Sequence, residues 1–85
     1  MNSKQHAQRA LNQLLSLIIG SRFAKETDHM KDEPLKRVYQ CHRLITIEQD
    51  EAFGDIKKMN QINRKLDALK SLTVLAQLEE NIDWE

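Results

Sequence analysis

The chain has 85 residues, of which 40% are hydrophobic, two are glycine and one is proline. A chain of this length has room for one domain, and so few turn-forming residues exclude most all-β architectures. Thirteen basic and thirteen acidic residues balance, so no net charge draws the protein toward nucleic acid or a membrane. We therefore expect residues 1–85 to form a single all-α domain.

The first helix is predicted from about residue 3 to residue 23. Apolar residues recur there every three or four positions, which is the pattern of an amphipathic helix. Ser3 suits the N-cap, and the pair Gly20-Ser21 suits an end or a bend. The expected buried stripe contains Ala7, Ala10, Leu11, Leu14, Leu15 and Ile18, with Ile19 and Phe23 beside it.

A polar connection, residues 25–33, leads to a second helix predicted over about residues 34–48. Pro34 is well placed in a first helical turn, where its missing N–H is not needed. The expected stripe contains Leu35, Val38, Tyr39, His42 and Ile45. His42 lies at the centre of that stripe, so we expect a buried core or interface histidine, with a ligand or pH-switch role as the alternative.

The third helix is predicted over about residues 55–80, with an acidic C-terminal tail at residues 79–85. Gly54 would end the second helix, and Asp55 would cap the third. The alternative is that Gly54 is tolerated within a helix and helices two and three fuse into one rod. The expected stripe contains Met59, Ile62, Leu66, Leu69, Thr73 and Ala76.

After Leu69 a second apolar stripe opens on another side of this helix. A helix that is apolar all round is a buried helix, and two other short helices that covered both of its sides would leave little for the rest of the core. The sequence therefore predicts a three-helix bundle or helical hairpin that dimerises through its C-terminal helix; the alternative is a monomer with helix three at its centre. The expected protein-interface residues are Leu69, Leu72, Leu75, Leu78, Ile82 and Trp84.

No group of residues predicts catalysis, a cofactor or a metal ion. Cys41 and His42 are adjacent and point about 100° apart on a helix, so they cannot form a nucleophile–base pair. The histidines and the single cysteine show no metal-ligand spacing, and two glycines cannot build a phosphate-binding loop. We expect a protein that is not an enzyme and has no small-molecule substrate.

Two other functions stay open from the sequence. Four basic residues on helix three, Lys57, Lys58, Arg64 and Lys65, predict phosphate contacts if the protein is a DNA-binding regulator. A histidine phosphotransfer role for His42 is the second alternative, although bulky neighbours surround that residue.

The single cysteine, the absence of a signal-peptide core and the short apolar runs predict a cytoplasmic protein without a membrane span. The favoured function is a small non-enzymatic interaction module. It would bind itself as a homodimer and another protein as an inhibitor, adaptor or assembly and regulatory factor, by burying an amphipathic helix in an apolar groove.

Overall fold

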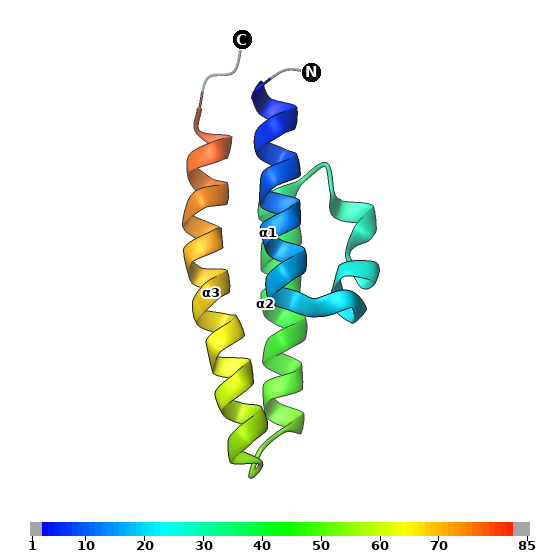
Figure 1. Ribbon diagram of the computed structural model, residues 1–85, viewed down its shortest axis with the longest axis vertical. Helices are drawn as coiled ribbons and strands as arrows, with labels where there is room; N and C mark the ends of the chain where they lie inside the picture. The colour runs from blue at the N-terminus through cyan, green and yellow to red at the C-terminus, as the bar shows by residue number, and fades with distance from the viewer. Residues whose placement is uncertain (1–2, 83–85) are drawn as a thin grey trace.

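The computed structural model describes residues 3–82, which form three α-helices and one 3₁₀ turn. The helices are α1 (Ser3–Glu26), α2 (Pro34–Glu51) and α3 (Ile56–Glu80), and the turn η1 (Asp28–Met30) lies in the α1–α2 connection. No strand occurs within the described range, which confirms the all-α class. Helices α2 and α3 lie antiparallel, and α1 runs beside the half of this hairpin nearest the two chain ends (Figure 1).

Helices α2 and α3 are separate. Gly54 has a φ of 92°, a left-handed conformation that ends the connection without steric cost to a side chain. The carboxylate of Asp55 then caps α3 by accepting a hydrogen bond from the Lys58 backbone N–H at 3.2 Å. Helix α2 continues to Glu51, beyond residue 48, because Ile45 is fully buried and packing outweighs the low helix propensity of the β-branched run.

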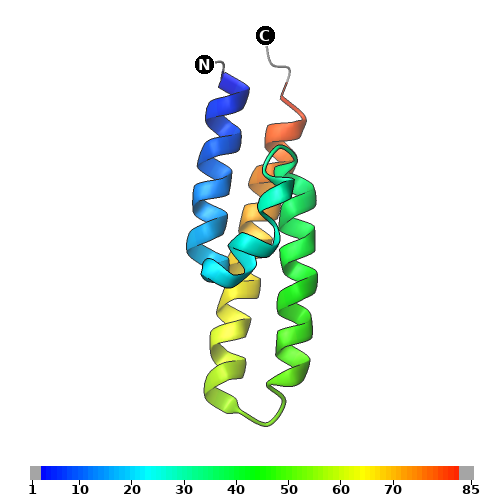
Figure 2. The same cartoon turned by 90° about the vertical axis from the view of Figure 1, so that its right-hand side faces the viewer.

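Helix α1 bends sharply at Gly20. Its φ of 81° and ψ of 169° belong to a region that almost only glycine occupies. Beyond the bend, the last turn of α1 leaves the hairpin and leads into η1, and the connection then returns to the start of α2 (Figure 2). As a result, α1 covers only one half of the α2–α3 hairpin.

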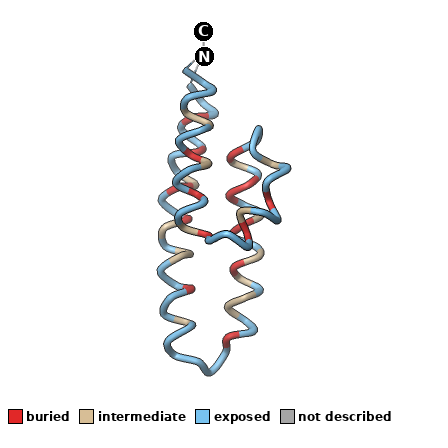
Figure 3. The backbone as a smooth tube through the Cα atoms, turned by 45° about the vertical axis from the view of Figure 1, so that its right-hand side comes forward, coloured by how far each residue is buried: buried red, intermediate tan, exposed pale blue. Residues whose placement is uncertain are grey.

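The core lies where all three helices meet. Buried positions concentrate at the level of α1 and are sparser toward the α2–α3 turn (Figure 3). The buried apolar residues are Leu11, Leu15, Ile19, Phe23, Val38, Cys41, Ile45, Ala52, Ile62, Leu69, Leu72 and Ala76.

On α1 the buried stripe is rotated from the predicted one. Successive buried residues are four positions apart, so Ile19 and Phe23 lie in the stripe itself and not beside it. Ala10 is exposed and Leu14 is half-exposed. The prediction was wrong here because leucine and alanine are common on both sides of this helix and periodicity alone did not fix its phase.

On α2 the predicted stripe was also rotated, and the expectation of a buried His42 was wrong. His42 is exposed and Tyr39 is half-exposed, whereas Arg37 and Cys41 are buried beside Val38 and Ile45. The sequence pattern treats arginine as a surface residue. In this protein an arginine occupies the buried face, so the pattern placed the centre of the stripe about one residue away.

Candidate functional site

The outer side of α3 carries an apolar seam near the C-terminus, formed by Val74, Leu75, Leu78 and Ile82. Each side chain is about half exposed; Leu78, for example, is 57% exposed. Leu75 and Leu78 are three residues apart and lie on one side of the helix, and Ile82 follows two residues after the helix ends at Glu80. That side faces away from the core positions Leu72 and Ala76.

The seam is confined to the last turns of α3. At the preceding positions on the same side the helix carries Arg64, Asp67 and Ser71, all exposed. The apolar character of the outer side therefore begins only at Val74. Exposed apolar side chains also occur on α1, at Leu14 and Leu17.

The residues predicted for the protein interface divide into three groups. Leu75, Leu78 and Ile82 are accessible on the seam, whereas Leu69 and Leu72 are 0% and 2% exposed. These two leucines belong to the core of the single chain, which agrees with the place of Leu69 in the predicted buried stripe and leaves neither residue accessible for an interface. Trp84 lies outside the described residues.

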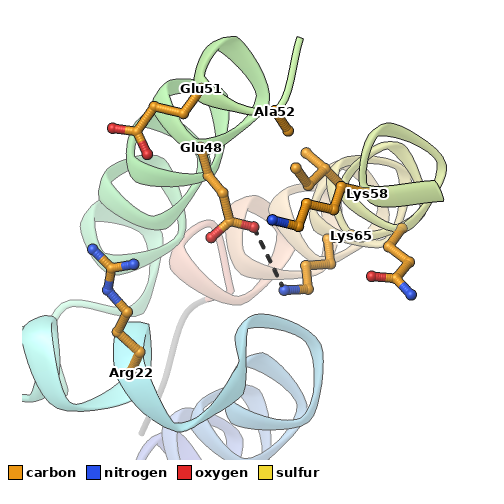
Figure 4. A pocket seen from close by; sticks show the side chains of 8 residues that line it. Arg22, Glu48, Glu51, Ala52, Lys58 and Lys65 are labelled. Atoms are coloured by element: carbon orange, nitrogen blue, oxygen red, sulfur yellow. Dashed lines mark ion pairs between the residues drawn. The ribbon is translucent and has the colours of Figure 1, made fainter. Parts of the chain in front are cut away.

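The four basic residues predicted for nucleic acid lie on two sides of α3. Lys57 and Arg64 are exposed on the outer side, while Lys58 and Lys65 line a pocket of about 380 Å³ between α2 and α3. In this pocket the Lys65 ammonium lies 3.9 Å from the carboxylate of Glu48 (Figure 4). The structure therefore does not bring the four cations together on one surface.

The pocket lies in the half of the hairpin that α1 leaves uncovered. Arg22 from beyond the α1 bend, Glu48 and Glu51 from α2, and Lys58 and Lys65 from α3 line it together (Figure 4). Side chains of both charges surround the apolar floor made by Ala52 and Ile62. The three basic side chains exceed the two acidic ones by one charge, and the long side chains shield the apolar floor from water.

Cys41 and His42 lie in different environments. His42 is exposed in a shallow pocket with Tyr39, Lys70 and Thr73. The Cys41 thiol is buried and donates a hydrogen bond to the hydroxyl oxygen of Thr27, with a sulfur–oxygen distance of 3.6 Å. The two residues therefore form no nucleophile–base pair.

The Cys41 thiol is expected to be unreactive in the folded protein. Burial raises the pKa of this thiol above its ordinary value of 9.0, although the Thr27 hydrogen bond and the charge of Arg37 act in the opposite direction. The thiolate is therefore scarce at neutral pH, and it is the thiolate that reacts. Labelling with a thiol reagent at pH 8 should be slow, and denaturant should accelerate it to the rate of a free thiol.

The raised pKa of the Cys41 thiol also predicts how the stability of the fold changes at alkaline pH. The folded state favours the protonated thiol, so the contribution of Cys41 is fully present below pH 9 and is lost as the pH rises through the raised folded pKa. Cys41→Ala should remove this part of the alkaline loss, as measured by urea denaturation between pH 8 and pH 11. Fast labelling of native protein at pH 8 would contradict both statements.

Arg37 is the most unexpected residue in the fold, since its side chain is only 1% exposed. Its Nε donates to the Thr27 hydroxyl at 3.0 Å, Nη1 donates to the Asn12 side-chain oxygen, and Nη2 donates to the Ala24 carbonyl at 3.2 Å. One side chain thus ties α2 to both α1 and the connection that follows the bend.

Two of these partners are held in place by further hydrogen bonds. The Thr27 hydroxyl donates to the Phe23 carbonyl at 2.8 Å, and the Asn12 amide donates to the carbonyls of Gln8 and Lys31, each at 2.9 Å. Sequence reasoning missed this network. The one available signal was that Arg37 falls four residues before Cys41, on the same side of α2.

Within residues 3–82, no helix combines the length and the hydropathy that crossing a bilayer requires. The same residues contain no group of three or more His, Cys, Asp or Glu side chains close enough to hold a metal ion.

Comparison with known proteins gives no relative: no family model, no curated protein and no solved structure matches this chain. Any statement about function therefore depends on the geometry and the chemistry of the chain itself.

Proposed function

We propose that this protein is a non-enzymatic interaction module of the three-helix bundle type, which associates through the apolar seam on α3. The observation that carries the proposal is the exposure of Val74, Leu75, Leu78 and Ile82 together at the C-terminal end of α3. A contiguous exposed apolar patch on a small protein marks a surface that contacts another protein. The seam would associate with a second copy, and through it the protein would act as an inhibitor, adaptor or assembly factor.

The expected strength of such a dimer follows from the seam's size. Covering the exposed half of each aliphatic side chain contributes roughly 1 kcal/mol, or about 8 kcal/mol for four residues counted on both chains. Association costs about 4–15 kcal/mol in lost motion before side chains are ordered. The seam alone therefore supports a weak dimer, and Leu14 and Leu17 on α1 offer additional apolar surface.

A DNA-binding regulator is a weaker proposal on this geometry. Lys57 and Arg64 are free to reach phosphates, but Lys65 is directed toward Glu48 in the pocket between the helices. Binding to duplex DNA through few cations would disappear at moderate salt. A gel shift with random duplex DNA at low salt tests it, and absence of a shift removes the proposal.

Phosphotransfer through His42 also remains a proposal. The structure supplies one supporting feature, since His42 is exposed and lies beside Lys70 in a shallow pocket. Phosphoramidate formation requires a donor protein or a phosphorylated small molecule. Retention of full biological activity in His42→Gln would exclude this role.

The proposed dimer is tested by molar mass as a function of concentration. Wild-type protein should move from the mass of one chain toward that of two as its concentration rises from micromolar to millimolar, as measured by sedimentation equilibrium. Leu75→Asp and Leu78→Asp should each remain monomeric, because dimerisation would bury an unpaired carboxylate in an apolar interface.

The matched control for these variants is Ile56→Asp. Ile56 is 75% exposed and lies on the same helix, about 33 Å from Leu78 at the rise of an α-helix. This variant should dimerise as the wild type does. A wild-type chain that stays monomeric at millimolar concentration, or equal dissociation by Ile56→Asp, would contradict an α3 seam dimer.

A further inference from the structure

Arg37 is a buried cation without an acidic partner. None of the ion pairs among residues 3–82 includes it, and its three acceptors are a hydroxyl, an amide oxygen and a backbone carbonyl. Buried charged groups are normally paired because burial of a charge without a counter-charge is strongly unfavourable. The fold thus holds a guanidinium whose three hydrogen-bond acceptors are all neutral, and the exposed carboxylate of Asp28 interacts with it only through a weaker charge effect.

The guanidinium also has unused hydrogen-bonding capacity. It has five N–H groups, and the structure accounts for three of them, one on each nitrogen. The two remaining N–H groups are on Nη1 and Nη2, the nitrogens that bind both oxygens of a carboxylate or a phosphate in bidentate pairs.

Arg37 lies between two hollows on the surface. The larger, of about 770 Å³, is lined by Arg37, by the polar side of α1 and by Lys31 and Asp32 from the connection. The smaller, of about 410 Å³, is lined by Arg37, Ser16, Ala24, Lys25, Asp28 and Lys31. Arg37 is only 1% exposed, so its guanidinium lies just beneath these hollows, and a ligand contacts it only at the small part of its surface that lines them.

Basic residues outnumber acidic ones around these hollows. The basic side chains that line them are Arg9, Lys25, Lys31 and Arg37, and the acidic ones are Asp28 and Asp32. Arg9 forms no ion pair within the described range. Uncharged side chains, Gln8 and Gln13 among them, also line the larger hollow.

We propose that the larger hollow is a binding site for a small oxyanion, a phosphate- or carboxylate-bearing ligand, held by Arg37 at its base and by Arg9 and Lys31 at its rim. The ligand is bound and not converted, so the proposal adds a regulatory ligand to a non-enzymatic protein. Because Arg37 ties α1 and the connection to α2, occupancy of the site would stabilise the region around the α1 bend.

The carboxylate of Asp28 does not serve as the anion at this site. Its carboxylate is exposed and lies 2.7 Å from the Lys31 ammonium. The Lys31 hydrogen bond is the main reason that the pKa of Asp28 lies below its ordinary value of 3.8, with Arg37 contributing a weaker charge effect. Lys31 has two further ammonium N–H groups that can reach a ligand.

The first experiment titrates full-length protein with inorganic phosphate and, separately, with citrate, each compared with sodium chloride at the same ionic strength. At about ten times the dissociation constant, binding to the folded state should raise Tm by roughly 5–10 °C. Backbone amide resonances of residues 5–17, 24–32 and 37 should shift with the same saturation curve. Tighter binding of phosphate or of citrate identifies the ligand class.

Three variants on the rim test the location without disturbing the core. Arg9→Gln and Lys31→Gln should each weaken binding roughly tenfold, since a charged hydrogen bond is lost. Asp32→Asn should tighten binding several-fold, because it removes the like charge that lines the hollow. Lys57→Gln changes another exposed lysine, on α3, and is the matched control that should bind as the wild type does.

Two results would overturn the proposal. The first is the absence of any rise in Tm with phosphate or citrate beyond that with chloride. The second is equal binding by wild type, Arg9→Gln and Lys31→Gln, which would show that the anions act elsewhere or only as salt. Neither result affects the proposed dimer through the α3 seam, because that proposal is tested separately by the molar mass of the protein in chloride.

Discussion

Leu69→Ala should lower the free energy of unfolding by about 2–5 kcal/mol, the usual cost of truncating a fully buried leucine. Leu69 is 0% exposed and belongs to the core shared by the three helices. Since a small domain has a total stability of about 5–15 kcal/mol, this single change removes a large part of it. Urea denaturation followed by circular dichroism measures the loss.

Leu78→Ala is the matched control for that experiment. It makes the same chemical change on the same helix, but Leu78 is on the seam, so the loss should stay within about 0.5 kcal/mol at concentrations where the protein is monomeric. Similar losses in the two variants would mean that the core and the seam have been assigned to the wrong sides of α3.

Arg37→Ala should cost about 3 kcal/mol or more. It removes three hydrogen bonds and leaves the acceptors of Thr27, Asn12 and Ala24 with fewer donors inside the fold. Arg37→Met keeps most of the volume and should cost less, because it also removes the desolvated charge. Urea denaturation in chloride, without phosphate or citrate, separates this structural role from ligand binding.

Arg43→Ala provides the comparison for Arg37, since Arg43 is on the same helix and is exposed. Its effect should stay within about 0.5 kcal/mol. An Arg37→Met variant at least as stable as the wild type would show that desolvation of the guanidinium outweighs its three hydrogen bonds. The connection after the α1 bend would then be held by apolar packing alone.

The candidate surfaces were only partly visible in the sequence. The apolar seam could be predicted because Leu75, Leu78 and Ile82 follow one another at helical spacing after a core stripe has already been assigned. The Arg37 hollow could not, because it is made by α1, α2 and the connection together, and no local pattern relates Asn12, Thr27 and Arg37. Those residues become neighbours only when α1 bends at Gly20.

Helix content was determined by the sequence alone, and the sequence favoured a break between α2 and α3 while leaving a fused rod open. Helical periodicity, a scarcity of turn residues and the Gly54–Asp55 pair are local features, and local features act on the backbone without help from the rest of the chain. The phase of each buried stripe was decided by the tertiary structure. Leucine and isoleucine occur on several sides of these helices, so the buried side is the one that the other two helices reach.

The position of Arg37 shows most clearly the difference between what the local sequence favours and what the tertiary structure decides. Taken alone, an arginine in an amphipathic helix favours solvent, because its charge is best hydrated there. Inside this fold, Thr27, Asn12 and Ala24 supply acceptors that replace water. Only the three-dimensional arrangement can supply them together, and that is why the charged residue lies on the buried side of α2 and His42 on the exposed one.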